Sequence, residues 1–151
     1  MVTFERPRPD PETEGEVLLE RILAFAIDAV GFSILVSVIA NLVYLVSASL
    51  GIVLNLLGVP LFFAYFVYFE AEYGQTVGKM VTDVVVVADG GGPIDYRAAT
   101  IRSLVRIVDL FPYPLHLVGL VAILLTDRNQ RLGDIAADTV VVRAREKGEK
   151  L

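Results

Sequence analysis

Residues 29–69, AVGFSILVSVIANLVYLVSASLGIVLNLLGVPLFFAYFVYF, form a run of 41 residues without any Asp, Glu, Lys, Arg or His. A bilayer hydrocarbon core about 30 Å thick is crossed by roughly 20 helical residues, so this run can hold two crossings and a turn. Small residues and a glycine at 47–51 predict the turn, with helices over 22–46 and 52–69. A buried hairpin of a soluble protein is the alternative, but soluble helices keep a polar stripe that these two lack.

The rest of the composition narrows the class of protein further. The chain has 151 residues, 55% of them hydrophobic, no Cys and a formal net charge of −5. The absence of Cys excludes a disulfide scaffold and thiolate zinc sites, and the acidic balance argues against nucleic-acid binding. The length allows one domain. We divide it into a disordered, acidic, Pro-rich tail (1–20), a membrane domain (21–143) and a charged tail (144–151).

The second half of the chain predicts two strands with a helical segment between them. Residues 81–88 and 138–144 are rich in β-branched side chains, and the first run ends in a Gly-Pro turn. Because a lone strand is unstable in water, we expect the two runs to pair, which places both on one side of the membrane. Helices over 95–111 and 115–127, both short, would bring the chain back as a tilted pair or a partly inserted hairpin. A single crossing, giving three in total, is the alternative.

Lys and Arg set the predicted orientation. Three precede residue 22, none lies in the 47–51 turn, four lie between 79 and 106, and six follow residue 126. The positive-inside rule places these segments in the cytoplasm. We therefore expect an all-α, multi-pass protein of the cell membrane with about four membrane-inserted helices in two hairpins. A small two-stranded β element and both termini would be cytoplasmic.

Asp28 is the acidic residue that stands out, because it falls inside the first predicted membrane helix. Such a carboxylate costs about 2.5–3.5 kcal/mol at the helix centre, so it should be paired, protonated or next to water. Arg102, Arg106 and Asp109 share one face of a later helix by their spacing. We expect Asp28 to meet Arg106 or Arg102 inside the bundle. This ion pair would either fix helix register or form a proton or cation site.

The sequence offers little for an enzyme. It contains no G-x-S-x-G, no H-E-x-x-H and no cluster with metal-ligand spacing. Residues 74–79, GQTVGK, are not a phosphate loop, because only three residues separate the glycines and Met80 follows the lysine. We expect no catalytic activity, no cofactor and no metal.

Four segments together carry a family resemblance: RILAFAID (21–28), GQTVGK (74–79), the strand and turn at 84–93, and RLGDIAADTVVV (131–142). In these segments the chain resembles the RDD family of small membrane proteins, named for one arginine and two aspartates. The resemblance assigns the naming residues to Arg21, Asp28 and Asp134. Many relatives have His where this chain has Gly133, and often Gly where it has Asp138, a difference that bears on the local turn.

The resemblance implies one candidate function, and the sequence leaves a second of a different kind open. Some members have been proposed to exchange sodium or other monovalent cations for protons. Asp28 would then be the carrier carboxylate, Arg21 or Arg106 would tune its pKa, and Asp134 would be a cytoplasmic gate or a structural cap. Four short helices make a small pathway, so an exchanger would need a second copy of the chain. The alternative is a scaffold or accessory protein, whose polar groups hold the bundle and whose strands recruit a partner.

Overall fold

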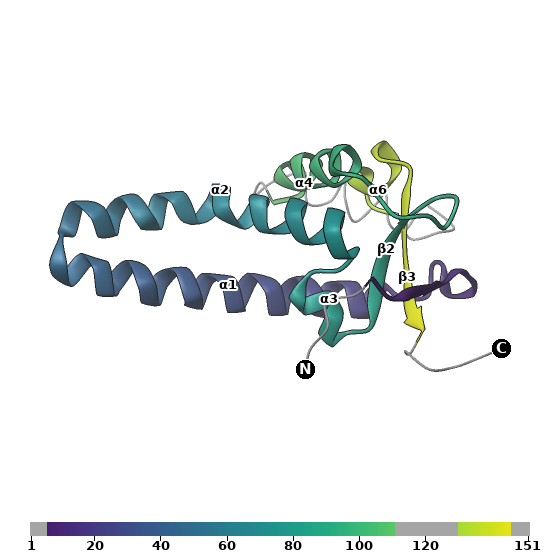
Figure 1. The fold of residues 1–151 in the computed structure, drawn as a ribbon, viewed down its shortest axis with the longest axis horizontal. Coiled ribbons are helices and arrows are strands. Elements are labelled where there is room, and N and C mark those ends of the chain that lie inside the picture. Colours follow the sequence, from purple (N-terminus) through teal and green to yellow (C-terminus); the bar gives the residue numbers. More distant parts are fainter. Residues whose placement is uncertain (1–5, 111–129, 146–151) are drawn as a thin grey trace.

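The computed structural model describes residues 6–110 and 130–145, with side chains through residue 106 in the first range. Figure 1 shows a long helical hairpin that projects from a small sheet, with shorter helices around the junction between them. The elements are β1 (Arg8–Asp10), the 3-10 helix η1 (Pro11–Thr13), α1 (Leu18–Val46), α2 (Ala48–Tyr73), α3 (Val77–Val81), β2 (Val84–Ala88), α4 (Tyr96–Leu110), α6 (Leu132–Ala136) and β3 (Thr139–Arg145).

Helices α1 and α2 form the hairpin that the charge-free run predicts. Both are long and apolar enough to span a membrane, and only 11% of the most apolar window of each is buried within the protein. The turn is tighter than expected, because α1 ends at Val46 and α2 begins at Ala48. Gly51, expected to help break the helix, lies within α2. A Cβ at this position would come 2.6 Å from the Cβ of Tyr44, so the glycine allows the two helices to cross closely.

Beside the hairpin lies a three-stranded antiparallel sheet in the order β1-β3-β2. The two valine-rich runs pair as expected, with Val86 opposite Val141. The predicted number of two strands is wrong, since β1 adds a third with Pro9 opposite Ala144. Residues 8–10 were expected to be disordered, yet they lie on the sheet edge, where a proline lacking an N–H is tolerated. Asp10 also pairs with Arg145 at 3.1 Å.

Helix α4 runs over nearly the residues predicted for it. Asp95 caps its first turn, because Oδ1 accepts a hydrogen bond from the Ala98 N–H at 2.7 Å. Strand β3 continues through Arg145, so the expected tail starts later than residue 144. The helix predicted over 115–127, the side chain of Asp109 and residues 146–151 lie outside what the structure describes.

Candidate functional site

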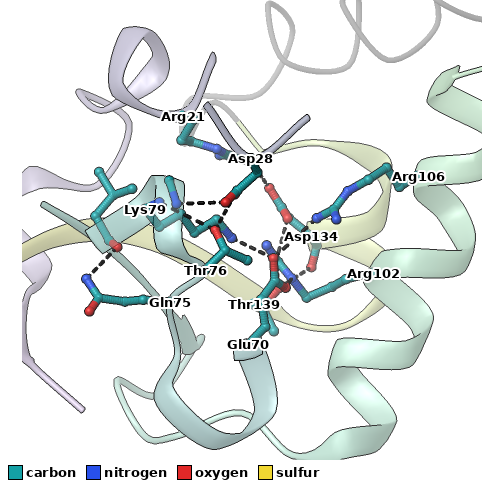
Figure 2. A network of polar contacts seen from close by, with 12 residues as sticks. Arg21, Asp28, Glu70, Gln75, Thr76, Lys79, Arg102, Arg106, Asp134 and Thr139 are labelled. Atoms are coloured by element: carbon teal, nitrogen blue, oxygen red, sulfur yellow. Dashed lines mark hydrogen bonds and ion pairs between the residues drawn. The ribbon is translucent and has the colours of Figure 1, made fainter. Parts of the chain in front are cut away.

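Where the hairpin meets the sheet, polar side chains gather in a buried cluster that we call the polar layer (Figure 2). Every member is 7% exposed or less, although most are charged or strongly polar. Because unpaired buried charges are very costly, such a layer is stable only if its members satisfy one another. Its residues are Arg21, Asp28, Glu70, Gln75, Thr76, Lys79, Arg102, Ser103, Arg106, Asp134 and Thr139.

Glu70, near the end of α2, is one of two carboxylates that organise the cations of this layer. Its Oε1 lies 2.6 Å from Lys79 Nζ and 3.2 Å from Arg106 Nη2, and its Oε2 lies 3.0 Å from Arg102 Nε. The guanidinium of Arg106 also stacks on the Phe66 ring, 3.7 Å from its centroid. Burial lowers the pKa of Lys79 to about 8, although Glu70 opposes this shift. Glu70 thus joins α2 to α3 and α4.

Asp134, at the start of α6, is the second organising carboxylate. It pairs with Arg21 of α1, and its Oδ1 lies 2.5 Å from Arg102 Nη1. Its Oδ2 also accepts from the Arg131 N–H at 3.1 Å, which caps α6. Burial alone would raise the pKa of Asp134, but Arg102 and Arg21 hold it well below its ordinary value. Arg102 therefore bridges the Glu70 and Asp134 groups.

Asp28 holds α3 against the hairpin through uncharged donors. Its Oδ1 accepts hydrogen bonds from Tyr65 Oη and from the Gly78 N–H, each at 2.7 Å, and its Oδ2 accepts from Thr76 Oγ1 at 2.5 Å. Glycine is required at position 78, because a Cβ there would lie 2.1 Å from the carbonyl oxygen of Ala24. Helices α1, α2 and α3 thus meet at one carboxylate.

The polar layer lies at one end of the hairpin and not at its middle. Residues 29–46 of α1 carry no charge and extend for about 27 Å, close to the roughly 30 Å of a hydrocarbon core. Asp28 and Glu70 bound the charge-free run at its two ends, and both belong to the layer. Asp28 is therefore at the edge of the apolar span, and not inside the membrane as predicted from the helix over 22–46.

Comparison with known families is decisive for the identity of the chain. The model of the RDD family matches residues 17–138. The chain belongs to the RDD family. No curated protein and no solved structure matches it. Family membership and the two apolar helices together indicate a membrane location.

The three residues that the family resemblance assigns as the naming residues, Arg21, Asp28 and Asp134, all lie in the polar layer. Arg21 and Asp134 form an ion pair with each other, 113 residues apart in sequence. Asp28 belongs to the same layer but accepts hydrogen bonds from other residues, among them Thr76. Gly133 and Asp138, the two positions expected to differ from many relatives, each have a distinct local geometry. Gly133 packs α6 against α4, with its would-be Cβ 3.1 Å from the Arg102 carbonyl oxygen. Asp138 has φ 49°, a left-handed conformation that glycine adopts easily and aspartate tolerates.

The structure brings together five of the six predicted site residues, and the sixth, Asp109, has a side chain outside the described part. The predicted pairing within the group is wrong. Arg102 forms ion pairs with Glu70 and Asp134, and Arg106 pairs with Glu70; neither arginine has a described ion pair with Asp28. Asp28 is already satisfied by neutral donors, so it does not need a cation.

The predicted site residues did not include Tyr65, which donates to Asp28, or the following members of the polar layer: Glu70, Gln75, Thr76, Lys79, Ser103 and Thr139. Glu70 is the first ionic residue after the charge-free run, and this position could have identified it as a site residue. The 74–79 motif could likewise have identified Thr76 and Lys79. Gly74 ends α2 in a left-handed conformation and accepts from the Val86 N–H, while Gln75 Nε2 donates to the Val84 carbonyl at 2.8 Å. The motif connects the hairpin to the sheet.

Among the residues with described side chains, no group of three or more acidic or histidine side chains could hold a metal ion. The polar layer connects the helices around it. Its ion pairs join α1, α2, α3, α4 and α6. Chemically it can fix the angle and register between the hairpin and the sheet. In some proteins buried polar or ionic groups specify a single arrangement of the elements around them.

Proposed function

We propose that this RDD protein is a non-catalytic scaffold of the cell membrane. The α1–α2 hairpin anchors it, and the polar layer holds the three-stranded sheet rigidly at one membrane face, where the sheet recruits a partner protein. The observation that carries this proposal is the organisation of the buried carboxylates. Each of Asp28, Glu70 and Asp134 is engaged by at least three donors at the base of the hairpin.

A carboxylate that carries an ion has to exchange partners and to communicate with both sides of the membrane. Asp28 instead binds the Gly78 backbone N–H, which is fixed by close packing on Ala24. On the side of the hairpin tip, about 27 Å of charge-free helix separates it from Ser47. These features favour a structural role for Asp28.

The orientation of the scaffold forms part of the proposal. The pairing of strands β2 and β3 supports an even number of crossings between them, and so favours four crossings over three. The sheet and the described ends of the chain lie at the same end of the hairpin (Figure 1). Because this end carries the Lys and Arg residues, we place it in the cytoplasm, with a multi-pass topology.

The second candidate is exchange of a monovalent cation for a proton at Asp28, carried out by an assembly of two or more copies. One observation favours it: among the described ion pairs none involves Asp28, whose three donors are all neutral. A cation could replace Tyr65 and Thr76 without breaking a salt bridge.

Proton flux in vesicles separates the two candidates. The purified protein is reconstituted in vesicles that contain a pH-sensitive dye, and Na⁺ or K⁺ gradients are applied. The scaffold predicts the same proton flux as protein-free vesicles. A cation-dependent proton flux that disappears in the Asp28→Asn variant would overturn the scaffold and establish the exchanger. The variant must still elute from a size-exclusion column as the wild type does, which shows that it is folded.

A further inference from the structure

The short helix α3 has an apolar face that no described residue covers. Val77 and Val81 are 46% and 64% exposed, and their spacing of four places them on the same side of the helix. The opposite side carries Gly78 and Lys79, both buried in the junction with the hairpin. α3 therefore separates the polar layer from whatever medium surrounds it.

α3 packs against the end of the hairpin nearest the sheet. The Gly78 N–H donates to Asp28, and the Val77 N–H donates to Tyr65 Oη at 2.9 Å. The exposed large side chains of α1 just before the charge-free run are also apolar, with Ile22 53% and Leu23 48% exposed. The exposed large side chains of α3 and of this part of α1 are thus all apolar.

We propose that α3 is a membrane-interface helix, with Val77 and Val81 among the acyl chains at the bilayer boundary nearest the sheet. The charge-free part of α1 accounts for most of the hydrocarbon thickness, and α3 meets α1 at Ala24, just over one turn before that part begins. This depth is the headgroup and acyl boundary, where apolar faces of surface helices lie. Lipid then forms the outer wall of the polar layer beside Lys79.

The absence of Cys from the chain makes the test direct, because each single-Cys variant carries one label. An environment-sensitive fluorophore is attached at Val77→Cys or Val81→Cys in the full-length protein in phospholipid vesicles. Leu56→Cys is the lipid reference, since Leu56 is 72% exposed on α2, and Gly90→Cys is the water reference, in an open turn. The quenchers are phospholipids brominated near the glycerol end or near the methyl end of the chain, and aqueous iodide.

We expect brominated lipid to quench labels at positions 77 and 81 to an extent comparable with position 56. At positions 77 and 81, bromine near the glycerol end of the chain should quench more strongly than bromine near the methyl end. Iodide quenching should be several-fold weaker than at position 90. Iodide quenching equal to that at position 90 would overturn the proposal by placing α3 in water. Protection from both quenchers would overturn it too, because protein would then cover the face.

Discussion

Among single residues in the described part of the chain, Glu70 forms the largest number of ion pairs. It is fully buried and pairs with Lys79, Arg102 and Arg106. Glu70→Gln keeps the shape but leaves the buried Lys79 and Arg106 without their described counter-ion, while Arg102 keeps only Asp134. Removing one partner of a buried ion pair costs about 3–5 kcal/mol, so we expect a loss of that size or failure to fold. Thermal unfolding in detergent measures it.

Glu72→Gln is the matched control, because Glu72 lies two residues away and its side chain is exposed. Exposed substitutions usually stay within about 0.5 kcal/mol of the wild type. If Glu70→Gln were as stable as Glu72→Gln, the polar layer would not be holding these cations through Glu70.

Lys79 should titrate at an unusual pH. Burial lowers its pKa to about 8 from an ordinary 10.5. Between these values the unfolded chain binds more protons than the folded one, so this group makes the free energy of unfolding rise with pH across that window. NMR of ¹⁵Nζ-labelled lysine should show one amine titrating near pH 8, assigned by its absence in Lys79→Arg. Ordinary titration of all three lysines in the chain would contradict the burial of Lys79.

At the scale of elements, the contact of α3 with α1 depends on a glycine. A Cβ at Gly78 would lie 2.1 Å from the Ala24 carbonyl oxygen, and backbone cannot move aside as a side chain can. We expect Gly78→Ala to displace α3, remove the Asp28 hydrogen bond and cost about 1–3 kcal/mol or more. Gly31→Ala is the control, because a Cβ there meets nothing within 4 Å. Equal melting temperatures of the two variants would show that α3 is not packed this closely.

The elements differ in how far the sequence could predict them. The hairpin and the valine-rich strands follow from local composition, and their ends fall within a few residues of the prediction. β1 does not, because an acidic, Pro-rich segment has no strand pattern, and its pairing with β3 joins residues at opposite ends of the chain. The ion pairs of the polar layer join residues 9 to 113 positions apart. Composition could identify several of those ions, but only the three-dimensional arrangement selects their partners.

For the whole molecule, the fold places the hairpin turn and the sheet at opposite ends (Figure 1). With the proposed orientation, Ser49 beside the turn faces outward, and Gly90 in the open turn after β2 faces the cytoplasm. We expect a membrane-impermeant maleimide to label Ser49→Cys in intact cells, and Gly90→Cys only after permeabilisation. Both positions are exposed, so labelling reports sidedness and not burial. Labelling of Gly90→Cys in intact cells would invert the orientation, since β2, β3 and the polar layer form one unit that cannot be split across a bilayer.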